Sequence, residues 1–306
     1  NRNFSDIYSP YLPAAKQGET AHRYVLGLYH IMDELTTRFP EILFEGCSSG
    51  GNRFDLGILN YFPQIWASDN TDALCRTGIQ NSYSYGYPLS VFTAHVSSCP
   101  NHQTLRITPL ETRFQVASFG ILGYECNLKD LSGSELNAIR EQIALYKKWR
   151  DLFQFGTFYR GTENEDSDSE TLSWTCVSPD GRRAVGLFFR RLTTPNQSHD
   201  WYRPAGLLPD VKYHFYGRNI KYNLKDFGDL VNTVSPVHIK QGSALQEILS
   251  RFVNMDGEKE DLTAYGDTLM LAGIALKPAF AGTGYNSDTR LFPDFSSRIY
   301  FMEAVE

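Results

Sequence analysis

Hydrophobic residues recur along the first half of the chain in a pattern that alternates between helix and strand. In residues 19–39 the apolar positions lie three or four residues apart, which predicts a helix that ends before Pro40. Short apolar runs predict buried strands at residues 42–44, 64–67, 89–96 and 121–126. Helices are predicted between these strands, at residues 55–61, 71–82 and 109–119.

A long helix is predicted to close this alternating region. Ser132 and Glu135 have the spacing of a capping box, and apolar residues at helical spacing follow from Leu136 to Tyr146. Strands that alternate with helices usually pair in parallel. Four such units are either half of an eightfold α/β barrel or an open sheet of four or five strands, and the pattern alone leaves both open.

The pattern changes after about Phe155. Strand-like runs, several separated by turn signals such as Pro179-Asp180-Gly181, predict antiparallel strands at residues 172–177, 184–190, 211–216, 268–276 and 298–304. Residues 243–252 have the pattern of a helix. The sequence therefore predicts two domains, an α/β domain over residues 1–156 and an antiparallel β domain over residues 157–306.

Composition and charge narrow the classes of function. A net charge of -6 argues against nucleic acid or an anionic membrane as the main partner, and no apolar run approaches the ~20 residues that span a bilayer. The five cysteines are odd in number and lack a CxxC pair, which fits reduced thiols in a cytoplasmic protein. The spacing of His95 and His102 does not fit a helical HExxH site, so we expect no metal and no cofactor.

Candidate chemistry lies where the predicted strands end, because catalytic groups of α/β barrels project from the C-terminal ends of their strands. Asp69 directly follows a buried strand, which suits a general acid; the alternative is that Asp69 or Asp72 caps the next helix. Two glycines within Cys47–Arg53 allow the backbone to approach a ligand, although a tight turn is the simpler explanation. The full set of strand-end candidates is Glu45, Cys47, Ser68, Asp69, His95, Ser97, Tyr124 and Glu125.

Three stretches of the chain resemble glycoside hydrolase family 36. The first is FPEILFEGCSSGGNRFD at residues 39–55, and the second is QIWASDNTDA at residues 64–73. The third combines AHVS at 94–97, PNHQT at 100–104 and TPLETR at 108–113. These motifs stand in the order of that family, and weaker similarity through the C-terminal part extends the resemblance over essentially the whole chain.

The resemblance implies a fold and a set of site residues. The fold would be the second half of a (β/α)8 TIM barrel followed by a C-terminal antiparallel β-sandwich. Asp69 matches the family's acid/base, whereas Cys47 and Gly50 match its Cys-Ser-x-Gly-Gly segment, which lies against galactose. Asp72 is expected to cap the helix or to support the site from behind. Asn1 matches the asparagine of the family's Lys-Trp-Asp-Met-Asn-Arg motif, so the nucleophilic aspartate is expected just upstream of Asn1.

The resemblance also implies an activity and partners. The expected reaction is retaining hydrolysis of terminal α-1,6-linked galactose, as in melibiose or raffinose, with an N-terminal segment supplying the remainder of the barrel. A cytoplasmic homo-oligomer is expected. Two alternatives stay open: a non-catalytic galactoside-binding or assembly fragment, and another member of the family, namely a transferase such as raffinose synthase or an α-N-acetylgalactosaminidase.

Overall fold

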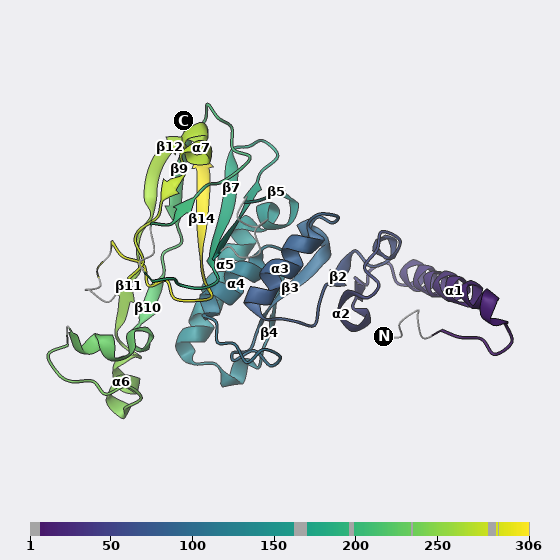
Figure 1. Ribbon diagram of the computed structural model, residues 1–306, viewed down its shortest axis with the longest axis horizontal. Coiled ribbons are helices and arrows are strands. Elements are labelled where there is room, and N and C mark those ends of the chain that lie inside the picture. The colour runs from purple at the N-terminus through teal and green to yellow at the C-terminus, as the bar shows by residue number, and fades with distance from the viewer. Residues whose placement is uncertain are drawn as a thin grey trace. The chain divides into compact units, whose positions relative to one another are not determined.

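The chain divides into two compact units. The structure, a computed structural model, describes residues 7–161, 170–195, 199–233, 235–280, 286 and 288–305. By contacts between residues, one unit comprises Asn1–Arg106 and Ala117–Cys126, and the other comprises Ile107–Val116 and Asn127–Glu306 (Figure 1). The domain boundary predicted at residue 156 stays a prediction, because these contacts do not test it.

The first unit is built on a parallel sheet whose strands follow one another in the order β1-β2-β3-β4. The parallel pairing expected from the alternating pattern is therefore confirmed. Its strands are β1 (Glu45–Gly46), β2 (Gln64–Trp66), β3 (Phe92–Ser97) and β4 (Ile121–Glu125), and its helical segments are α1 (Gln17–Arg38), α2 (Ser48–Gly51) and α3 (Ala73–Tyr83). Helix α4 (Leu110–Ser118) leads from the second unit back to β4.

Three predicted elements of this unit are placed differently in the structure. The strand expected at residues 89–96 begins only at Phe92, because residues 89–91 form the 3-10 turn η4 (Leu89–Val91). The strand expected at residues 42–44 begins only at Glu45, and Ile42 and Leu43 are 54% and 68% exposed. Pairing with β2 starts at Glu45, so an apolar run alone gave the wrong bounds. The helix expected at residues 55–61 is a single 3-10 turn, η3 (Ile58–Asn60), whose Ile58 amide donates to the Asp55 side chain.

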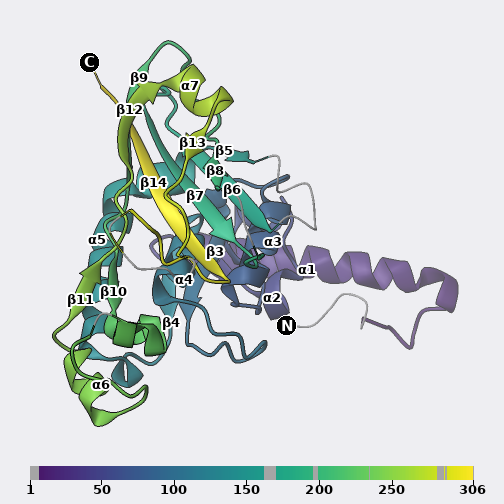
Figure 2. The same ribbon diagram turned by 60° about the vertical axis from the view of Figure 1, so that its left-hand side comes forward.

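The second unit contains an antiparallel sheet in the order β12-β9-β14-β7-β6-β5 (Figure 2). These strands are β5 (Thr157–Arg160), β6 (Thr171–Val177), β7 (Arg183–Arg190), β9 (Lys212–Gly217), β12 (Asp261–Tyr265) and β14 (Ser296–Ala304). Helix α5 (Gly133–Phe155) packs on this sheet, where Trp149 lies 4.7 Å from the ring of Phe301. The predicted capping box is confirmed, since Ser132 and Glu135 bond each other's amides.

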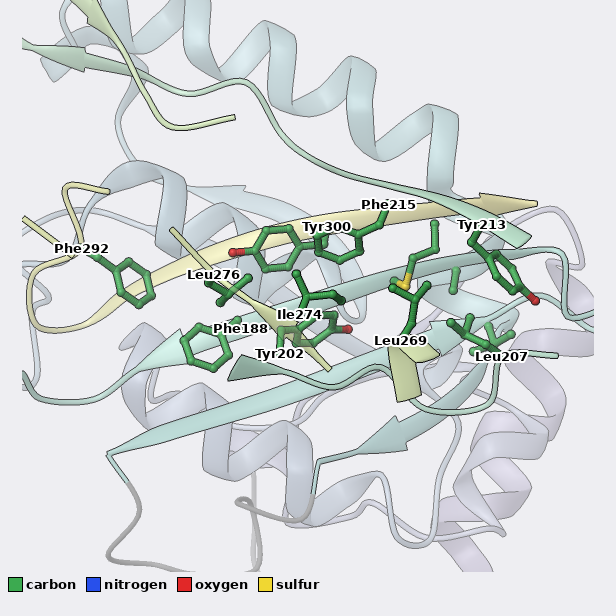
Figure 3. Close-up of a cluster of buried hydrophobic side chains, with 13 residues drawn as sticks. Phe188, Tyr202, Leu207, Tyr213, Phe215, Leu269, Ile274, Leu276, Phe292 and Tyr300 are labelled. Carbon is green, nitrogen blue, oxygen red and sulfur yellow. The ribbon is translucent and has the colours of Figure 1, made fainter. Parts of the chain in front are cut away.

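A second layer covers the sheet with strands β8 (Trp201–Tyr202) and β13 (Ile274–Ala275) and helix α7 (Gly266–Leu271). Tyr202 and Ile274 from this layer pack against Tyr300 and Phe188 of the sheet, in a closed hydrophobic cluster (Figure 3). The continuous strand predicted at residues 268–276 is wrong, because the chain forms α7 and then turns at Gly273, with φ of 80°, into β13.

A separate two-stranded ribbon carries the remaining elements. Strands β10 (Lys221–Asn223) and β11 (Asn254–Asp256) pair antiparallel, and between them lie the 3-10 segment η7 (Leu224–Thr233) and helix α6 (Ala244–Leu249). The predicted helix in this region is confirmed in part, since Ser243 caps α6 by accepting a hydrogen bond from the Gln246 amide.

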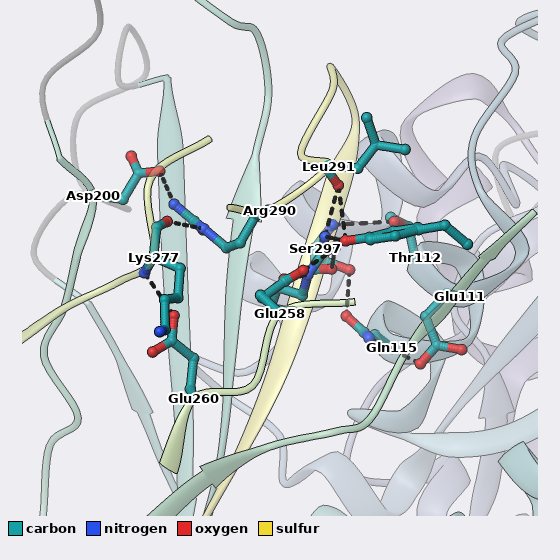
Figure 4. A network of polar contacts seen from close by, with 12 residues as sticks. Glu111, Thr112, Gln115, Asp200, Glu258, Glu260, Lys277, Arg290, Leu291 and Ser297 are labelled. Atoms are coloured by element: carbon teal, nitrogen blue, oxygen red, sulfur yellow. Dashed lines mark hydrogen bonds and ion pairs between the residues drawn. The ribbon is translucent and has the colours of Figure 1, made fainter. Parts of the chain in front are cut away.

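Buried polar contacts hold the parts of the second unit together (Figure 4). Ser297 of β14 donates from its amide to Thr112 and from its hydroxyl to Gln115, which ties α4 to the sheet. Asp200 accepts from both Arg190 and Arg290, two arginines with no exposed surface. In the part of the chain that the structure describes, no helix has both the length and the apolar character needed to cross a membrane.

Candidate active site

The ends of the four parallel strands lie along one edge of the sheet. The register places Gly46 beside Ile65, Trp66 beside Thr93, and Ser97 beside Glu125. The carboxyl ends of parallel strands meet at the same edge, so the turn after β1 and the Asp69 loop after β2 open on the same side as Glu125. Asn1, the remaining site residue expected from the sequence, lies outside the described residues.

Asp69 is exposed and is held by one neighbouring side chain. The indole Nε1 of Trp66 donates a hydrogen bond of 2.9 Å to Oδ1 of Asp69. Among the described residues, no donor contacts Oδ2 of Asp69. The carboxyl group is therefore fixed through one oxygen, and the other oxygen is free to exchange a proton with a bound molecule.

Asp72, three residues further along, is the helix cap. Its Oδ1 accepts a hydrogen bond of 3.0 Å from the Cys75 amide at the start of α3, and its Oδ2 accepts one of 2.7 Å from Thr104. Arg106 forms an ion pair with Asp72 at 2.6 Å. Burial works to raise the pKa of Asp72, but these bonds and the charge of Arg106 outweigh it and hold the pKa below its ordinary value. The capping role belongs to Asp72, so Asp69 is left for other chemistry.

The turn after β1, which contains the short segment α2, adopts an unusual left-handed backbone. Ser48, Ser49, Gly50 and Gly51 have φ angles of 51°, 58°, 78° and 89°. Non-glycine residues occupy this region rarely and at a cost of about 1–2 kcal/mol each, so such strain often marks a functional segment. The Gly51 amide closes the turn by donating to the Cys47 carbonyl at 2.7 Å.

This turn lies directly against Asp69. A Cβ atom placed on Gly50 would stand 2.8 Å from the Asp69 amide nitrogen and 3.2 Å from its Cγ. Glycine is therefore required for the turn to approach the Asp69 loop, a role that the sequence pattern did not reveal. Cys47, which begins the turn, is exposed. The structure thus brings the turn that Cys47 begins against Asp69 through Gly50.

Arg76 and His95 complete the surroundings of Trp66. The guanidinium of Arg76, on α3, lies 4.5 Å from the Trp66 ring centroid, and its Nη2 donates to the Ser68 carbonyl at 3.0 Å. Burial lowers the pKa of Arg76 to about 10, although the nearby carboxylates work against that shift. Sequence reasoning missed Arg76; its place one turn into the helix that follows Asp72 was the available signal.

The His95 ring lies 4.5 Å from the Trp66 ring, and its Nδ1 lies 3.3 Å from Oε2 of Glu125. Burial lowers the pKa of His95 below its ordinary value, and the Glu125 carboxylate opposes that shift. His95 is therefore neutral at neutral pH. Among the described residues, no group of three or more His, Cys, Asp or Glu side chains could hold a metal ion.

Comparison with known families and structures identifies the protein family to which this chain belongs. The model of the family Melibiase matches residues 1–156, and the model of the glycosyl hydrolase family 36 C-terminal domain matches residues 171–302. The chain belongs to glycoside hydrolase family 36. Its parallel sheet is accordingly the second half of a (β/α)8 barrel, and the open-sheet alternative is excluded.

Curated and solved relatives agree with this assignment. α-Galactosidase 1 of Pediococcus pentosaceus is 48% identical over 213 residues, which is 70% of this chain and 29% of the relative. The crystal structure of the α-galactosidase from Lactobacillus brevis superposes with a TM-score of 0.75 at 36% identity, covering 98% of this chain and 34% of that one. A variant of α-galactosidase AgaA from Geobacillus stearothermophilus, solved with raffinose, has a TM-score of 0.73 at 38% identity and similar coverage. The chain thus spans about a third of the length of the relatives it matches.

Proposed function

We propose that this chain supplies the acid/base side of a retaining α-galactosidase site, with Asp69 as the acid/base. The observation that carries the proposal is the position of Asp69 in a chain of this family. It follows a strand of the barrel sheet, lies against the Gly50 turn, and leaves the helix cap to Asp72. Relatives named α-galactosidases, among them two AgaA variants solved with raffinose and with stachyose, support an oligosaccharide substrate, which we propose ends in α-1,6-linked galactose.

The reaction divides into two displacements. In the first, a carboxylate expected upstream of Asn1 attacks the anomeric carbon, and Asp69 gives its proton to the departing glycosidic oxygen. In the second, Asp69 as a carboxylate takes a proton from the water that displaces the nucleophile, so galactose leaves with its configuration retained. Retention requires the two carboxyl groups to stand about 5–5.5 Å apart.

The turn from Cys47 to Gly51 would bind the sugar. Its exposed Cys47 and its side-chain-free Gly50 line the approach to Asp69, so the galactose ring can lie against the backbone there. Asn1 is assigned to the same subsite through the family motif alone. Asp72 acts indirectly, because its contacts with the Cys75 amide and with Arg106 fix the loop that carries Asp69.

Substitution of Asp69 tests the acid/base assignment. In the full-length polypeptide that contains this chain, Asp69→Ala is expected to lower kcat on raffinose by roughly 100-fold or more, because protonation of a sugar leaving group is lost. Cleavage of p-nitrophenyl α-galactoside should suffer less in the first step, since its leaving group departs without a proton. Asp33→Asn, at an exposed position of α1, is the control. Unchanged raffinose hydrolysis by Asp69→Ala would refute the assignment.

Because this chain covers only about a third of each relative, a second function is considered: a galactoside-binding or assembly fragment without catalysis. We expect hydrolysis of p-nitrophenyl α-galactoside only when the N-terminal segment that completes the barrel is present with this chain. Binding of raffinose without hydrolysis in both preparations would favour the fragment instead. Product analysis with excess acceptor sugar separates hydrolysis from transfer, as in raffinose synthase. Cytoplasmic location and homo-oligomerisation stay predictions.

A further inference from the structure

We infer that Trp66 is a positioning residue that reserves Oδ2 of Asp69 for proton transfer, an inference that rests on the proposed acid/base role of Asp69. The indole N–H is a donor only, so the oxygen it contacts must act as an acceptor. That oxygen is Oδ1, at 2.9 Å from Nε1 of Trp66. In the acid form of Asp69 the proton therefore resides on Oδ2.

The same hydrogen bond is compatible with every protonation state in the cycle. When Asp69 protonates the glycosidic oxygen, the O–H bond at Oδ2 breaks and its electron pair stays on the carboxylate. When Asp69 later takes a proton from water, the new O–H bond again forms at Oδ2. Because Oδ1 accepts from Trp66 throughout, the carboxyl group has no reason to rotate between the two steps.

The Trp66 ring is itself held in place, which gives its N–H a fixed direction. The ring is 8% exposed and packs against Arg76 and His95, each at 4.5 Å. Arg76 also donates to the carbonyl of Ser68, so one guanidinium braces both the indole and the loop that carries Asp69. A buried ring with these neighbours is poorly placed to stack on a sugar, so its contribution to the site is made through Nε1.

Replacing the indole with a phenyl ring tests this role. Trp66→Phe keeps an aromatic ring against Arg76 and His95 but removes the donor to Oδ1. We expect kcat on raffinose to fall roughly 10- to 100-fold, because a loosened carboxyl group protonates the leaving oxygen less efficiently. The first-step release of p-nitrophenol from p-nitrophenyl α-galactoside and the KM for raffinose should change by less than about 3-fold, because neither depends on the leaving-group proton.

A matched control separates this effect from lost packing. Trp149→Phe makes the same chemical change at another buried tryptophan, in the second unit. It should alter hydrolysis of the two substrates equally or not at all. Equal losses in raffinose hydrolysis and in the first-step release of p-nitrophenol by Trp66→Phe would overturn the inference and leave Trp66 with a packing role.

A spectroscopic measurement keeps the inference testable if Trp66→Phe folds poorly. The chain has four tryptophans, so its indole ¹⁵N–¹H spectrum has few signals, and the Trp66 signal is the one left unassigned once Trp149→Phe, Trp174→Phe and Trp201→Phe have each removed theirs. In the unsubstituted protein this signal should move with pH, and in Asp69→Asn it should not. A Trp66 signal that ignores pH in the unsubstituted protein would refute the hydrogen bond. Full raffinose hydrolysis by Asp69→Asn would instead refute the proposed function, and it would leave the hydrogen bond between Trp66 and Asp69 unaffected.

Discussion

The close approach of Gly50 to Asp69 makes Gly50→Ala the most informative single substitution outside the proposed acid/base. Gly50 has φ and ψ of 78° and 51°, a left-handed conformation that costs alanine about 1–2 kcal/mol. The new methyl group would stand 2.8 Å from the Asp69 amide, whereas ordinary contacts begin at 3.4 Å. The Asp69 backbone and the turn must therefore separate by about 0.6 Å.

A displacement of that size acts on catalysis more than on folding. Misplacement by about 1 Å can lower a rate roughly 100-fold, so we expect kcat on raffinose to fall by about 10- to 100-fold in Gly50→Ala. The free energy of unfolding should fall by about 1–3 kcal/mol, from backbone strain and the forced shift together. Raffinose hydrolysis by the full-length polypeptide and urea denaturation measure the two effects.

Gly242→Ala is the control for strain alone. Gly242 has φ of 75°, and a Cβ there meets nothing within 4 Å. This variant should lose about 1–2 kcal/mol of stability with unchanged kcat. If Gly50→Ala loses no more activity than Gly242→Ala, then the close approach of Gly50 to Asp69 does not matter for catalysis, and the proposed site is wrong.

Three further predictions concern charge and burial. The pKa of Asp72 is lower in the folded chain than the ordinary 3.8, so its carboxylate stabilises the fold above pH 3.8. The difference in unfolding free energy between the unsubstituted chain and Asp72→Asn should therefore vanish as the pH falls through the folded pKa of Asp72. Urea denaturation at successive pH values measures this difference. Asp200→Asn should cost about 3–5 kcal/mol of unfolding free energy, because two buried arginines lose their shared carboxylate, whereas Asp151→Asn at an exposed ion pair should cost at most about 1 kcal/mol. Burial raises the pKa of the Cys176 thiol, so alkylating reagents should label Cys176 only after denaturation and the exposed Cys47 before it.

Much of the fold could be predicted from periodicity, because most elements have a strong local pattern. The capping box at Ser132 and the helix stop before Pro40 depend on adjacent residues, and both were found in the sequence. The misplaced elements depend on distant partners instead. Strand β1 begins where it can pair with β2, and residues 268–276 form a helix and a strand because the chain must turn at Gly273 to reach β8.

The residues of the candidate site likewise fall into those that a local motif reveals and those that depend on distant contacts. Asp69, Cys47 and Gly50 could be named from motifs, and Asp72 could be suspected as a cap because it precedes a helix. Arg76 could not be assigned a role, because its contacts depend on how α3 lies on the sheet, and the bond from Trp66 to Asp69 could not be predicted, because the side-chain direction of Trp66 depends on its packing. Strand-end position suggested His95 and Glu125 as candidates, but their proximity of 3.3 Å needed the register of β3 and β4.

Asp69 and Asp72 show how one loop divides two tasks between identical side chains. Asp72 is buried and accepts from the Cys75 amide, Thr104 and Arg106, so its charge is committed to holding the loop on α3. An aspartate so tightly bonded has no proton to donate, because neutralising its charge would weaken several contacts at once. Asp69 has the opposite arrangement, with one fixed oxygen and one open to a ligand. In the proposed mechanism, the buried carboxylate of Asp72 therefore fixes the loop from which the exposed carboxyl group of Asp69 exchanges its proton.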